Sequence, residues 1–115
     1  MRSRFSAFAM GDVSYLLRTT TPGGPAWDPD PEWPAQLAAY IERTRFRDLR
    51  IIEAPAPHGD VGFVTFEATL DQASQQLVQR ERSRFVRADG RWSYHSGGDP
   101  GPGLRNASHP GPSIS

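Results

Sequence analysis

The sequence predicts a single α+β domain, in which N-terminal helices pack on a curved, four-stranded antiparallel sheet with a cone-shaped hollow. Apolar residues recur at helical spacing over the first third of the chain and then alternate with a period of two. The pair Asp89-Gly90 between two strand-like runs is typical of a two-residue hairpin turn. Helices that precede hairpin-joined strands cover one face of the sheet.

The helical part is divided by residues that favour helix ends. Gly11 suits the position after one helix, and Asp12 suits the cap of the next. Five prolines make 20–34 a loop, and Pro34 fits the first turn of a third helix. Three helices are therefore expected, at 2–10, 13–19 and 35–44.

The strands are bounded by turn residues. Pro55 and Pro57 end the first strand, and His58-Gly59-Asp60 follows as a turn. We expect a four-residue connection, 71–74, between the second strand and the third. The expected strands are 46–54, 61–70, 75–88 and 91–96.

Composition limits both the folding unit and its partners. The 115 residues make one domain, which we place at 1–96, followed by a disordered Gly/Pro/Ser tail at 97–115. The formal net charge is zero, which disfavours nucleic acid and acidic membranes as partners. No apolar run has the length of a membrane span, and no secretory signal opens the chain. A soluble cytoplasmic protein is expected.

The sequence points to no metal and no cofactor. It contains no Cys, which excludes disulfides, thiolate zinc sites and a Cys nucleophile. His58, His95 and His109 fall in a turn, a strand and the tail, without metal-ligand spacing. The glycines after residue 96 precede no helix, so they do not form a phosphate-binding loop.

Several segments, in this order and spacing, resemble the middle domain of YchJ-like bacterial proteins over roughly residues 1–98. They are Met1-Arg-Ser-Arg-Phe-Ser-Ala-Phe8, Gly11-Asp12, Tyr15-Leu-Leu17, Gly62-Phe-Val-Thr-Phe66, Glu81-Arg-Ser-Arg-Phe-Val86 and Asp89-Gly-Arg-Trp-Ser-Tyr94. The resemblance implies an α+β fold similar to nuclear transport factor 2, or cystatin-like. It implies no established biochemical role.

The chain departs from that family in two ways. Members usually carry Cys-rich SEC-C motifs, zinc-binding knuckles similar to the tail of the SecA motor, whereas this chain has no Cys. Either the motifs were lost, or the start codon is assigned too far downstream, so that the sequence omits an upstream motif. The family's Trp-His-Pro is here Thr20-Thr21-Pro22.

Strand 75–88 places polar residues on the face that the helices are expected to cover. Alternation puts Glu81 and Ser83 on that face. A buried carboxylate requires a partner, and we expect Arg2 or Arg4 of the first helix to reach Glu81. A structural salt bridge is the favoured interpretation.

The functional interpretation makes Glu81 a general acid/base or a ligand anchor in the cone. It is the one catalytic candidate, and no Asp–His or Tyr–Asp arrangement supports it. The expected pocket residues are Arg4, Tyr15, Glu81, Ser83, Trp92 and Tyr94.

The opposite face of the same strand carries a basic stripe of Arg80, Arg82 and Arg84. We expect the stripe to be solvated and paired with a neighbour such as Glu67, or to lie in a homodimer interface on the open sheet face. Nucleic acid is disfavoured as a partner. The favoured function is a non-enzymatic binding or protein-interaction module for an unidentified small molecule or protein. The alternatives are a small-molecule enzyme of the isomerase or dehydratase type and, from the SEC-C association, an auxiliary of protein export or translation.

Overall fold

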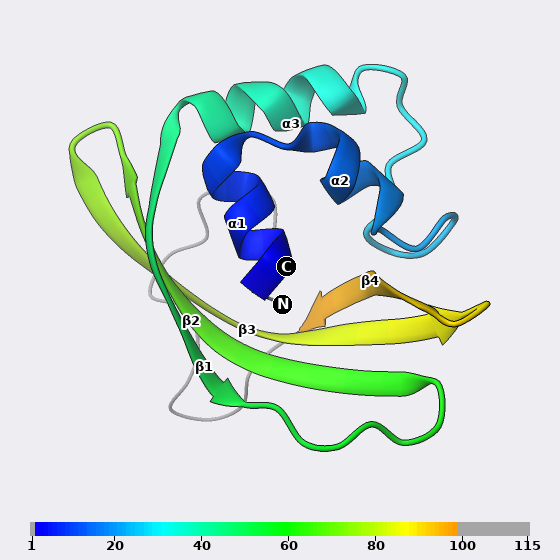
Figure 1. Cartoon of the computed structure of the whole chain (residues 1–115). Coiled ribbons are helices and arrows are strands. Elements are labelled where there is room, and N and C mark those ends of the chain that lie inside the picture. Colours follow the sequence, from blue (N-terminus) through cyan, green and yellow to red (C-terminus); the bar gives the residue numbers. More distant parts are fainter. Residues whose placement is uncertain (1, 99–115) are drawn as a thin grey trace.

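Three helices precede four strands along the chain, in the order that the sequence predicts (Figure 1). The structure is a computed structural model, and it describes residues 2–98. The elements are α1 (Arg2–Met10), α2 (Val13–Arg18), α3 (Trp33–Glu42), β1 (Thr44–Glu53), β2 (Val61–Gln72), β3 (Gln75–Ala88) and β4 (Arg91–Gly98).

The break between α1 and α2 is confirmed. Gly11 has a φ of 73°, which an L side chain rarely adopts, and the side chain of Asp12 accepts a hydrogen bond from the backbone N–H of Tyr15 at 3.1 Å. Helix α3 begins two residues earlier than expected, with Pro34 in its first turn. It also ends two residues earlier, because Thr44 already pairs with β2.

The sheet is antiparallel throughout, in the order β1-β2-β3-β4. Asp89 and Gly90 have φ values of 54° and 74°, which confirms the predicted two-residue turn. The four-residue connection expected at 71–74 is wrong. Strand β2 continues to Gln72, and Ala73 and Ser74 alone form the turn, with φ values of 47° and 69°.

Strand β4 extends to Gly98 and pairs with Arg82 there, two residues beyond the expected end of the domain. Its other edge is covered by the chain after α2. The N–H of Thr21 donates to the carbonyl of Tyr94 at 2.8 Å, and the N–H of Tyr94 donates to the carbonyl of Thr19 at 2.6 Å. The expected tail falls largely on 99–115, outside the described residues, and stays a prediction.

The helices lie on the concave side of the curved sheet, and α1 reaches into its hollow (Figure 1). Phe46 of β1 joins the two layers, since its ring lies 5.4 Å from Phe8 of α1 and 6.3 Å from Tyr40 of α3, between ring centroids. Among residues 2–98, no helix combines the length and apolarity needed to cross a bilayer. The buried core cluster is Ala7, Phe8, Leu16, Leu37, Tyr40, Phe66, Ala68 and Leu70.

Candidate functional site

A carboxylate is buried on the concave side of β3. Glu81 is 6% exposed and Ser83 is fully buried, which confirms the face predicted for them. Oε2 of Glu81 accepts hydrogen bonds from the hydroxyl of Ser83 at 2.7 Å and from the hydroxyl of Tyr94 at 3.2 Å. These two hydroxyl groups replace water as hydrogen-bond donors to a buried carboxylate.

Arg4 of α1 reaches the same place from the helix layer. Its Nη1 donates to Oγ1 of Thr19 at 2.5 Å and to the carbonyl of Leu16 at 3.3 Å. Its guanidinium carbon lies 4.9 Å from the centroid of the Tyr94 ring. Arg4 and Glu81 therefore both contact Tyr94, one at the ring and the other at the hydroxyl. We call Arg4, Glu81, Ser83 and Tyr94 the Arg4–Glu81 cluster.

Burial lowers the pKa of Arg4 from its usual value to about 10, and the nearby Tyr94, Tyr15 and Glu81 oppose that shift. The guanidinium is still protonated at neutral pH. Its charge is therefore held in a poorly hydrated position, where the field of the Glu81 carboxylate stabilises it.

Gly97 of β4 lies directly against the Glu81 carboxylate. A Cβ added at Gly97 would stand 2.5 and 2.7 Å from the two carboxylate oxygens, closer than van der Waals contact allows. A side chain at position 97 would therefore require the Glu81 carboxylate to move from its present position. The carboxylate has hydroxyl donors on one oxygen and backbone packed against both.

The structure brings four of the six expected pocket residues together in the Arg4–Glu81 cluster. Tyr15 lies close enough to Arg4 to oppose its pKa shift, whereas Trp92 lies elsewhere. Tyr15 donates its hydroxyl hydrogen bond to Ser3 at 2.8 Å, between α1 and α2. Trp92 is 37% exposed and lies beneath the guanidinium of Arg87, 5.1 Å from the ring centroid, near the β3–β4 turn.

The basic stripe lies on the convex face of the sheet, opposite the helices. Nε of Arg80 is 2.8 Å from Oε2 of Glu67, so the predicted pairing with Glu67 is confirmed. The guanidinium of Arg82 lies 4.1 Å from the centroid of the Phe63 ring. Arg82 and Arg84 are exposed.

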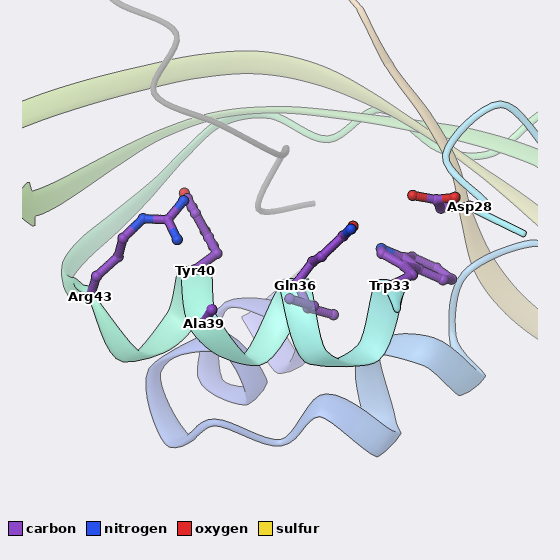
Figure 2. A pocket seen from close by; sticks show the side chains of 7 residues that line it. Asp28, Trp33, Gln36, Ala39, Tyr40 and Arg43 are labelled. Atoms are coloured by element: carbon purple, nitrogen blue, oxygen red, sulfur yellow. The ribbon is translucent and has the colours of Figure 1, made fainter. Parts of the chain in front are cut away.

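A second feature, a cavity along α3, was not expected from the sequence. It has a volume of about 450 Å³, within the range of small-molecule pockets. Asp28 and Trp33 lie at one end and Tyr40 and Arg43 at the other (Figure 2). We call it the α3 cavity, and its lining is Asp28, Trp33, Gln36, Leu37, Ala39, Tyr40 and Arg43.

Tyr40 is 1% exposed, and its hydroxyl has no hydrogen-bond partner among the described residues. Such a buried, unsatisfied group costs about 1–3 kcal/mol. Burial raises the pKa of Tyr40 to about 12, against the opposing charge of Arg43, so the hydroxyl keeps its proton. The helical spacing of α3 marked Tyr40 only as a core residue, and nothing local distinguishes a core tyrosine from one that lines a cavity.

Residues 2–98 contain no group of three or more His, Asp or Glu side chains that could hold a metal ion. The zinc of SEC-C motifs also has no thiolate ligands here, because the sequence has no Cys. The residues of this chain therefore do not fit the zinc of a SEC-C motif.

The curved sheet with helices on its concave side defines the class of protein. The chain is similar to the solution structure of a SEC-C motif containing protein from Rhodopseudomonas palustris, with a TM-score of 0.73 and 31% identity over 85% of this chain and 73% of that one. A crystal structure of a SEC-C motif containing protein from Psychrobacter arcticus shares the fold, with a TM-score of 0.64 and 24% identity over 87% of this chain and 56% of that one.

The family follows from the sequence match. Residues 1–97 match the family described as YchJ, middle NTF2-like domain, and the chain belongs to that family. It is 41% identical to a UPF0225 protein of Sodalis glossinidius over 96% of this chain and 70% of that protein. It is 40% identical to a UPF0225 protein of Corynebacterium efficiens over 84% of this chain and 68% of that protein. These names state no reaction and no ligand.

Proposed function

We propose that this chain is a non-enzymatic interaction module that binds an acidic segment of a partner protein on the convex face of its sheet. The observation that carries the proposal is the exposed pair Arg82 and Arg84 on that face. Among residues 2–98, no carboxylate lies within ion-pair distance of either guanidinium. The half-buried Phe63 beside them offers apolar contact.

Charge favours an acidic partner over the other occupants of this face. A second copy docked by two-fold symmetry would bring the stripe of one protomer towards the stripe of the other, and like charges in an interface are costly. The neutral net charge gives nucleic acid no long-range attraction to the chain. An acidic peptide meets both guanidinium groups without the like-charge penalty, and a short segment needs only these two local charges.

The enzyme alternative depends on Glu81. The carboxylate is 6% exposed, accepts two hydroxyl hydrogen bonds on one oxygen and packs against Gly97. A general acid/base must reach a substrate proton directly or through one water. The contacts of Glu81 instead favour a structural role, in which it stabilises the buried charge of Arg4.

The role in protein export or translation is supported only by association. The similar structure from Rhodopseudomonas palustris is of a SEC-C motif containing protein. The genomic sequence upstream of Met1 tests this alternative, because an in-frame Cys-rich segment there would support it.

Fluorescence anisotropy with a labelled peptide of repeated Glu-Asp-Phe units tests the proposed interface. We expect saturable binding at low salt that weakens as ionic strength rises. The double variant Arg82→Glu/Arg84→Glu should bind at least about tenfold more weakly, since charge-assisted contacts are lost. Arg91→Glu is the matched control, because Arg91 is an exposed arginine at the β3–β4 turn.

Two results would contradict the proposal. One is equal affinity of the parent and the double variant for the acidic peptide, or no binding by either. The other is a dimer of the parent, measured by light scattering, that the double variant converts to monomers. That result would make the convex face a homodimer interface.

A further inference from the structure

The α3 cavity combines features that the Arg4–Glu81 cluster lacks. Its lining includes apolar side chains, Leu37 and Ala39, and one buried hydroxyl, Tyr40, without a partner among the described residues. Buried polar groups in proteins are nearly always hydrogen-bonded. Tyr40 lines the cavity, and its unsatisfied hydroxyl would gain a hydrogen bond from a ligand that places an acceptor beside it.

A charge stands beside that hydroxyl. The guanidinium carbon of Arg43 lies 5.4 Å from the centroid of the Tyr40 ring, so both groups serve the same end of the cavity. Within residues 2–98, no carboxylate forms an ion pair with Arg43. A guanidinium and a phenolic hydroxyl side by side are donors that suit a carboxylate.

The other end of the cavity has the opposite character. Asp28 and the indole of Trp33 lie there, one helix length away from Arg43 (Figure 2). Arg43 follows Trp33 by ten positions along the chain, which corresponds to about 15 Å of helical rise. Asp28 repels an anion from its end, so the charges orient an elongated ligand with its anionic group at Arg43.

We propose that the α3 cavity binds an elongated small molecule with an aromatic or aliphatic body and a carboxylate. The carboxylate pairs with Arg43 and accepts a hydrogen bond from Tyr40. The body lies along Leu37 and Ala39 and ends against Trp33. This inference is independent of the proposed protein interface, because the cavity lies on the helix layer and the basic stripe lies on the convex face of the sheet.

Binding of phenylbutyrate to the full chain, followed by ¹H–¹⁵N NMR, tests the inference. For so small a probe the dissociation constant is expected on the order of 1 mM. Saturable shifts should appear at the indole N–H of Trp33 and at the amides of α3. The neutral analogue phenylbutanol should bind about tenfold more weakly, because it cannot form the ion pair.

Variants of the residues that line the α3 cavity distinguish binding at this site from unspecific binding elsewhere on the protein. Arg43→Gln should weaken phenylbutyrate binding about tenfold, and Tyr40→Phe several-fold. Arg45→Gln is the matched control, since Arg45 is an exposed arginine two residues away that does not line the cavity. Arg43 is also exposed, so its variant should fold, and its amide spectrum checks this.

The inference is overturned by any of three results. The parent could show no saturable shift at about ten times the expected dissociation constant. Phenylbutanol could bind as tightly as phenylbutyrate. Arg43→Gln could bind as tightly as Arg45→Gln, which would remove the role of the guanidinium.

Discussion

The concave side of the molecule carries two buried tyrosine hydroxyls in different surroundings. The hydroxyl of Tyr94 donates to Glu81 in the Arg4–Glu81 cluster, whereas the hydroxyl of Tyr40 has no partner among the described residues. Tyr94 is 4% exposed and Tyr40 is 1% exposed. Burial therefore does not distinguish them, and hydrogen bonding does. A satisfied cluster belongs to the fold, and an unsatisfied group in a cavity marks a place where a ligand can add stability.

The largest expected effect comes from removing the acid of the Arg4–Glu81 cluster. Glu81→Ala leaves Arg4 without its stabilising carboxylate and should lower the free energy of unfolding by about 3–5 kcal/mol. Chemical denaturation measures this. Glu53→Ala, at an exposed glutamate, should change stability little. A loss below about 1 kcal/mol for Glu81→Ala would show that the cluster does not hold the fold together.

The second effect is a pH dependence that belongs to Tyr40. Its pKa is raised to about 12 in the folded chain, above the ordinary value of 10.0. Its contribution is fully present below pH 10 and is lost as the pH rises through 12, because the unfolded state releases this proton first. Across that pH range, the contribution of Tyr40 to the free energy of unfolding of the parent should fall by about 2–3 kcal/mol.

Tyr40→Phe isolates that contribution. Arg4 has the opposite effect over the same pH range. Because its pKa is lowered in the folded chain, its contribution to stability rises with pH. The difference between the stability curves of the parent and Tyr40→Phe removes the Arg4 contribution. A constant difference from pH 9 to pH 12 would contradict the raised pKa of Tyr40.

A smaller effect tests the packing of Gly97 against Glu81. Gly97→Ala forces the carboxylate away from its hydroxyl donors and should cost about 1–3 kcal/mol. Gly98→Ala is the matched control, because its Cβ would meet nothing closer than the carbonyl oxygen of Arg82 at 3.7 Å. Equal stability of the two variants would mean that the contact does not constrain Glu81.

Local patterns in the sequence were enough to predict the framework of the fold. The break at Gly11-Asp12, the turn at Asp89-Gly90 and the inward direction of Glu81 each follow from residues within one element. The turn at Ala73-Ser74 was missed because neither residue signals a left-handed backbone, and the pairing of β2 with β3 imposes it.

The site was harder to predict, because it depends on contacts between distant elements. Tyr94 opposes Phe85 through a register shift after Arg84, which no alternation pattern reveals. Trp92 was expected near Glu81, but it lies towards the β3–β4 turn, where it pairs with Arg87. The α3 cavity depends on where the loop that carries Asp28 passes α3, and the sequence gives no distance between them.

The most direct test of the contrast compares Tyr94→Phe with Tyr40→Phe by chemical denaturation at neutral pH. Each variant removes one buried hydroxyl and keeps the ring. Tyr94→Phe should lower the free energy of unfolding by about 1 kcal/mol, because Glu81 loses a hydrogen-bond donor. Tyr40→Phe should be as stable as the parent or more stable, because its hydroxyl has no partner to lose. Equal losses for the two variants would contradict the account.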